Sequence, residues 1–215
     1  GRFSPTSSEP VAKQCSLRHL AAVTSRYRLE AASDQVAAAL AANQGPDPWG
    51  GGALSPGEFA PLVTRSQKTG HRVIRPIVWG YPAPGAEGIS ALGEVRWVPT
   101  VRNLESPFWI GNLRHSELRC LIPATAFMLR GKGREHWFAV PDSPVFAFAG
   151  IWRDLTDVPV FAILVTDASG EAKNAGANTM PCILEADQYD RWLRADWKEA
   201  QDLVAPYAGA LTICA

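Results

Sequence analysis

Three short, mainly apolar runs constrain the fold of this chain more than any other feature. They span residues 119–127, 146–152 and 161–166, and polar or glycine-bearing segments separate them. Runs of this length are typical of buried strands rather than helices. Shorter strand-like segments lie at 25–30, 60–63, 73–81 and 95–98, whereas helix-like patterns are confined to 33–42, 106–118 and the stretch from 186. We therefore predict a single α+β domain with a curled, barrel-like antiparallel sheet and a few flanking helices.

Two local signals refine this expectation. Ser33 precedes the Ala-rich segment and is predicted to cap a helix there. The proline within residues 73–81 predicts an edge strand or a bent strand, because proline cannot donate to a sheet ladder.

Composition and charge limit the classes of function. Of the 215 residues 47% are apolar, which suits one soluble domain, and Lys+Arg and Asp+Glu each total 21. A protein that coats nucleic acid usually carries a basic excess, so any DNA binding must use a local basic groove. No apolar run reaches the ~18 residues of a membrane helix. The cysteines have no CxxC or metal-ligand spacing, and they predict reduced thiols in a cytoplasmic protein without metal or cofactor: Cys15, Cys120, Cys182 and Cys214.

The first residues differ in character from the rest. Residues 1–22 are rich in Ser, Pro and Ala, have no periodicity and do not begin with Met. We expect a disordered leader or extension over 1–22 and a domain over 23–215.

Five sequence blocks follow one another in an order that resembles the SOS-response-associated peptidase (SRAP) family, whose members sense abasic sites in single-stranded DNA. The blocks are Ser25-Arg26-Tyr27, Ser55-Pro56-Gly57, Val78-Trp79-Gly80, Thr100-Val101-Arg102 with a following Ser-Pro-Phe-Trp, and the strand from Arg119 with the later Met180-Pro181. Because no single block is specific, the resemblance depends on their order. It implies the fold predicted above.

The resemblance also implies a covalent chemistry that this chain lacks. In the family a terminal Cys uses its α-amine and thiol to trap the aldehyde of an abasic sugar as a thiazolidine, and Asn, Glu and His assist. The matching positions here hold Thr24, Thr100, Leu129 and Gly176. None of these side chains supplies a thiol, a carboxylate or an imidazole. We therefore expect no catalytic residue and no enzyme activity.

What remains is an expected groove for single-stranded or damaged DNA, bound noncovalently. The resemblance implies that it is lined by Arg26, Pro56, Trp79, Arg102 and Thr166. Trp79 suits base stacking and core packing about equally, whereas Trp137 and Trp152 favour packing because of their apolar neighbours. The plain alternative for the two arginines is an ion pair.

Two other functions stay open. One is an active abasic-site sensor whose terminal Cys precedes Gly1, since residues 1–4 also resemble the family's opening, or is Cys15 after processing. The other is a phage or prophage protein-interaction module, which would bind a partner in the cleft that the family uses for DNA. Nothing in the sequence sets the oligomeric state.

Overall fold

The computed structural model describes residues 26–45, 49–84, 95–155 and 158–214. The expected extension over 1–22, and Thr24 at the position matched to the family's nucleophile, lie outside these residues.

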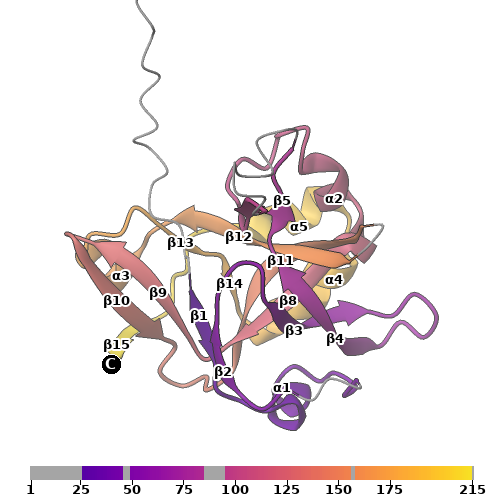
Figure 1. Cartoon of the computed structure of the whole chain (residues 1–215), viewed down its shortest axis with the longest axis horizontal. Helices are drawn as coiled ribbons and strands as arrows, with labels where there is room; N and C mark the ends of the chain where they lie inside the picture. Colours follow the sequence, from indigo (N-terminus) through magenta and orange to yellow (C-terminus); the bar gives the residue numbers. More distant parts are fainter. Residues whose placement is uncertain (1–25, 46–48, 85–94, 156–157, 215) are drawn as a thin grey trace, which may run out of the picture.

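The centre of the described fold is a closed ring of strands (Figure 1). The ring runs in the order β12, β4, β3, β8, β11 and back to β12. Its strands are β3 (Phe59–Arg65), β4 (Arg72–Trp79), β8 (Arg119–Ala124), β11 (Phe146–Asp154) and β12 (Pro159–Asp167). The apolar runs 146–152 and 161–166 lie in β11 and β12, and both faces of these strands are buried. The run 119–127 was predicted as one strand, but it divides at Thr125 into β8 and the start of β9 (Ala126–Gly131), which belongs to the second sheet. The predicted barrel-like core is confirmed.

Two pairings depart from the antiparallel expectation, those of β12 with β4 and with β7 (Thr100–Val101). β12 pairs with β4 in parallel, through Val160 with Val78 and Phe161 with Trp79. This contact closes the ring, and it joins strands from opposite halves of the chain.

β4 is also not the edge strand that its proline predicted. It lies between β3 and β12, and Pro76 stands opposite Pro61 of β3. The pairing with β12 involves only Val78 and Trp79, so Pro76 has no ladder partner on that side. The proline is tolerated because β4 is locally an edge at that point.

Short strands extend the ring. β7 (Thr100–Val101) runs parallel to β12, β13 (Thr179–Pro181) pairs with β12, and β14 (Ile183–Leu184) pairs with β11. β5 (Tyr81–Pro82) and β6 (Trp97–Val98) form a separate two-stranded ribbon.

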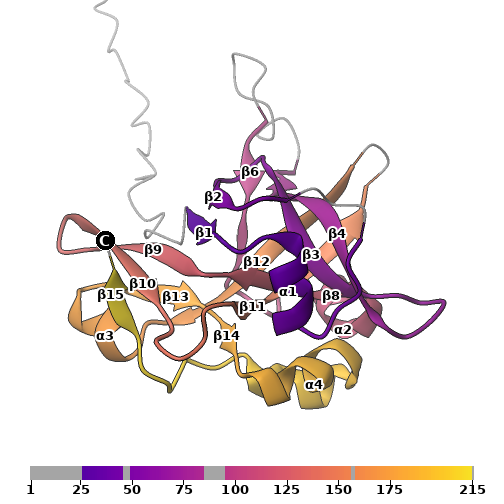
Figure 2. The same cartoon turned by 90° about the horizontal axis from the view of Figure 1, so that it is seen from below.

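A second sheet packs against the ring. Its order is β15, β10, β9, β1, β2, with β1 (Tyr27–Leu29), β2 (Gly52–Leu54), β9 (Ala126–Gly131), β10 (Arg134–Ala139) and β15 (Thr212–Cys214). Tyr27 and Phe127 on its inner face meet Phe148 of β11 edge-on, with ring centroids 6.0 and 5.7 Å away. The β9–β10 hairpin and the β3–β4 hairpin project from opposite ends of the molecule (Figures 1 and 2).

The helices are short and lie around the strands. They are α1 (Ser33–Ala39), α2 (Ile110–Arg114), α3 (Gly170–Asn174), α4 (Tyr189–Arg194) and α5 (Trp197–Ala200). Ser33 is the first helical residue and not the cap, which is Ala32. The backbone N–H of Ala32 donates to Oε1 of Gln35, three residues on, and this bond fixes the helix start. α4 is anchored to β8 because the Trp192 indole donates to the Cys120 carbonyl at 2.9 Å.

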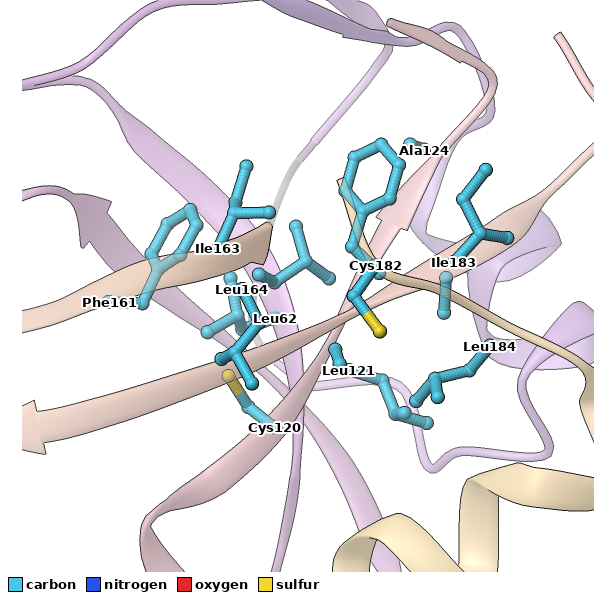
Figure 3. Close-up of a cluster of buried hydrophobic side chains, with 14 of the residues drawn as sticks. Leu62, Cys120, Leu121, Ala124, Phe161, Ile163, Leu164, Cys182, Ile183 and Leu184 are labelled. Atoms are coloured by element: carbon cyan, nitrogen blue, oxygen red, sulfur yellow. The ribbon is translucent and has the colours of Figure 1, made fainter. Parts of the chain in front are cut away.

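Apolar side chains fill the core between these elements (Figure 3). Leu62 of β3, Leu121 of β8 and Ile163 of β12 are each fully buried. Cys120 and Cys182 lie among them as free thiols, and burial raises the pKa of Cys182 to about 12. A thiol with such a pKa stays protonated, so both cysteines pack as small apolar residues, as predicted.

Candidate nucleic-acid interface

Trp79, one of the five predicted groove residues, is fully buried at the end of β4. Its ring stacks on Phe161 at 6.3 Å and meets Tyr27 edge-on at 5.0 Å, while its indole donates to the Pro99 carbonyl at 3.0 Å. No face of the ring is open to a DNA base in this conformation. The base-stacking expectation is therefore corrected: Trp79 is a structural residue that joins β1, β12 and the segment before β7.

Pro56 lies in the turn between β2 and β3, next to Gly57. The turn is fixed by Gly57, whose backbone N–H donates to the Trp79 carbonyl at 2.7 Å. Gly57 has a φ of +94°, and a Cβ there would lie 2.7 Å from Nε1 of Trp97. Glycine is thus required for both the backbone conformation and the approach of the indole.

The aromatic ring at the surface of this turn is Trp97, which is partly buried. It covers Gly57 and also Gly80, where an added Cβ would meet the Trp97 Cβ at 2.9 Å. Sequence reasoning missed Trp97. The available signal was the pair of glycines in the Pro-Gly and Trp-Gly blocks, since both leave a flat surface for a ring.

Arg102 and Thr166, two of the predicted groove residues, lie on one pocket. The parallel pairing of β7 with β12 leads Arg102 to the end of β12, where it forms an ion pair with Asp167 at 2.9 Å. Thr166 is almost buried, at 9% exposure. Both residues line an open pocket of about 350 Å³, together with Leu104, Val165, Asp167, Val204 and Pro206.

Arg26 belongs to a second cluster, on the outer face of the sheet formed by β1, β9 and β10. It donates to Glu135 at 2.5 Å, and Arg130 donates to the same carboxylate at 2.9 Å. These contacts, first that of Arg130 and then that of Arg26, hold the pKa of Glu135 below its ordinary value. One carboxylate is shared by two arginines, so this face keeps a positive excess.

An arginine–tryptophan stack completes this face. The guanidinium of Arg28 lies 4.1 Å from the ring centroid of Trp137, across strand β9. Met128, the β9 residue opposite Trp137, is 1% exposed. Packing in the core or in a groove wall is the prediction for Trp137; the residue is partly buried and lies on the outer face, because its neighbour Phe138 occupies the inner one. We name Arg26, Arg28, Arg130, Glu135 and Trp137 the outer basic face.

The positions matched to the family's proton carriers lie close to this hairpin. Leu129 is 1% exposed on β9, opposite His136. Gly176 follows α3 with a φ of +93°, and a Cβ there would lie 2.8 Å from Cγ of Lys132. Lys132 is three residues beyond Leu129, in the turn of the hairpin. Thr100 lies on β7, beside Ile163 of β12.

Two other features are absent from the described residues: a membrane-spanning helix and a metal site. No helix in these residues is long and apolar enough to cross a membrane. Within the same ranges, no group of three or more His, Cys, Asp or Glu side chains is placed to hold a metal ion.

A family comparison agrees with this arrangement of fold and motifs. The model for the SOS response associated peptidase (SRAP) family matches residues 23–215. The chain belongs to this family. No relative was found among curated proteins.

Solved structures show the same fold. A protein from Bordetella bronchiseptica aligns with a TM-score of 0.70 at 17% identity, over 89% of this chain and 99% of that one. One from Bacteroides thetaiotaomicron has a TM-score of 0.69 at 19% identity, over 88% and 91%. A phage-related protein from Bordetella bronchiseptica has a TM-score of 0.62 at 15% identity, over 88% and 93%.

Proposed function

We propose that this SRAP-family protein binds single-stranded or damaged DNA noncovalently and does not crosslink it. The observation that carries the proposal is the meeting of Arg102 and Thr166 on one open pocket. The resemblance to the family implies that both residues line the DNA groove. The Arg102 side chain is 57% exposed, so a phosphate can reach it.

The ion pairs of Arg102 and Arg26 allow each arginine to exchange its carboxylate partner for a phosphate. Arg102 holds Asp167, and Arg26 holds Glu135, with every one of these side chains at least a third exposed. Ion pairs of this kind contribute only about 0.2–1 kcal/mol, so a phosphate can displace the carboxylate at small cost. Arg28 and Trp137 add a cation and a π-face, the combination that single-strand binders use without reading sequence.

The absence of a crosslink follows from the residues at the matched positions. Leu129 and Gly176 hold the positions matched to the family's Glu and His, and neither can transfer protons. Thr24 carries no thiol. Binding without covalent capture is the activity that these residues leave.

The test is a fluorescence anisotropy titration of a labelled single strand at low and moderate salt. Affinity should fall steeply with salt, because phosphate contacts release counterions. Arg102→Ala should weaken binding equally for all sequences and lower the salt slope by about one. Asp167→Asn should strengthen binding, because it frees Arg102.

Lys68→Ala is the matched control, since Lys68 is an exposed cation in the β3–β4 turn at the other end of the molecule. Failure of the wild-type protein to bind a single strand at low salt would remove the proposal. A heat-stable shifted band on a denaturing gel, after incubation with abasic single-stranded DNA, would show that the protein crosslinks DNA after all.

A further inference from the structure

The tip of the β9–β10 hairpin presents its cations in a fixed arrangement. Its two turn residues, Lys132 and Gly133, have φ values of +50° and +75°. Positive φ at both positions is the turn geometry that fits the twist of a two-residue hairpin. Lysine is an unusual choice at the first of them. Here its ammonium is held by the Asn174 carbonyl at the end of α3, at 3.0 Å.

The inner side of this hairpin forms a pocket with α3. Arg134 and His136 alternate with Glu135 and Trp137 along β10, so they point away from the outer basic face. With Lys132 they line a pocket of about 500 Å³, whose other walls are Glu171, Asn174 and Ala175 of the α3 region and Ile213 of β15. Ile213 is 56% exposed and gives the pocket an apolar edge.

The cations of this pocket differ from Arg26, Arg102 and Arg130 in their ion pairs. The two arginines at Glu135 share a carboxylate, and Arg102 has Asp167. Over the ranges that the structure describes, by contrast, Arg134 has no carboxylate within ion-pair distance, and Glu171 is the single acid in the pocket wall. Lysine and arginine donors that converge beside one acid attract an anion.

We propose that this pocket is an anion subsite that takes the phosphate group of a nucleotide. A phosphate offers enough oxygens for both the Arg134 guanidinium and the Lys132 ammonium. The His136 ring and the exposed Ile213 lie beside these donors and suit the less polar sugar and base that accompany it. The pocket borders Gly176, so a strand that crosses the former catalytic position would bring its phosphates here. That the phosphate belongs to a DNA strand rests on the proposed function. A free nucleotide would present the same group.

The first test needs no DNA. Imidazole signals of the full chain are followed by NMR while a deoxynucleoside 5′-monophosphate, or the uncharged nucleoside, is added. The His136 signal should move with the monophosphate and stay fixed with the nucleoside. His71 and His115 lie outside the pocket and serve as internal controls. Arg134→Ala should abolish the movement, whereas Lys68→Ala should leave it intact. Equal movement of all three histidines, or none, would overturn the subsite.

The second test determines whether the phosphate comes from a DNA strand or from a free nucleotide. Arg134→Ala should weaken single-strand binding about tenfold, which is about 1.4 kcal/mol, because the phosphate loses a charged hydrogen-bond donor. Arg134 is chosen over Lys132 because Lys132 also holds α3, and thermal unfolding of the variant confirms that it folds. If His136 responds to the monophosphate while Arg134→Ala binds the strand normally, the subsite stands and the strand is excluded as its source. If His136 responds and the wild-type protein binds no strand at all, the proposed function fails and the subsite still stands.

Discussion

Trp79 and Trp137 occupy two regions of the molecule that use the same side chain in opposite ways. Trp79 is fully buried among Tyr27, Phe161 and the Pro99 carbonyl, where three segments meet. Trp137 is partly buried under the Arg28 guanidinium on the outer basic face. The comparison teaches that a tryptophan in one of the blocks shared with the family can be part of the core, whereas a tryptophan outside those blocks lies partly exposed beside an arginine. Removing either ring should therefore affect different properties.

The largest effect is expected for Trp79→Ala. Loss of a large buried aromatic ring leaves a cavity and should lower the free energy of unfolding by about 3–5 kcal/mol. Trp79→Phe should cost less, because the ring is retained and only the bond to Pro99 is lost. Chemical denaturation measures both. A loss below 1 kcal/mol for the alanine variant would mean that Trp79 does not tie the segments together.

Trp137→Ala should show the reverse profile. The free energy of unfolding should change little, whereas single-strand affinity should fall by roughly 1–3 kcal/mol if the ring stacks on a base. Trp137→Phe, which keeps an aromatic face, should retain most of the affinity. Anisotropy titrations together with denaturation separate the two effects. A variant that binds normally would assign Trp137 to packing alone.

A smaller effect is expected at Asp190, an exposed acid on α4. Its pKa is lowered chiefly by the hydrogen bond from Arg72, with a further contribution from Arg194. Because the folded pKa lies below the ordinary value of 3.8, the stabilisation is present above that pH and is lost as the pH falls through the folded pKa. At 63% exposure the pair contributes no more than about 1 kcal/mol. Denaturation of the wild type and Asp190→Asn should differ at neutral pH and converge in acid.

The smallest effect is expected for Tyr27→Phe. The Tyr27 hydroxyl is fully buried and has no hydrogen-bond partner among the described residues. Removing a buried unsatisfied group while keeping the ring should leave stability unchanged or raise it by up to about 1 kcal/mol. Thermal unfolding measures the change. A clear loss of stability would reveal a partner for the hydroxyl.

These contrasts also show how far the sequence could predict the structure. The barrel strands were predictable because residues 119–127, 146–152 and 161–166 are apolar on both faces. The parallel pairing of β12 with β4, which closes the ring, could not be predicted, because a pairing between distant segments leaves no local signal in the sequence. The residue type of Ser33 predicts a cap at that position. In the structure Gln35, inside the helix, fixes the helix start because its side chain accepts a hydrogen bond from the backbone N–H of Ala32.

The candidate site was predictable in part for a similar reason. The block order placed Arg102 and Thr166 in one groove, and the structure brings them to one pocket. The block order carries no information on which face of a strand a tryptophan occupies. For Trp137 the alternation with Phe138 did carry that information, because neighbouring residues of a strand point to opposite sides. The basic residues Lys132, Arg134 and His136, which stand at every second position, were likewise a visible signal for the pocket between the β9–β10 hairpin and α3.

The parallel contact between β12 and β4 has a kinetic consequence. Two hairpin-like units, β3 with β4 and β11 with β12, can each form from nearby residues, whereas the ring closes only when strands far apart in sequence find each other. Such a step loses much chain entropy before it gains contacts, and topologies of this type fold slowly. Refolding should therefore pass late through closure at the pairs of Val78 with Val160 and Trp79 with Phe161.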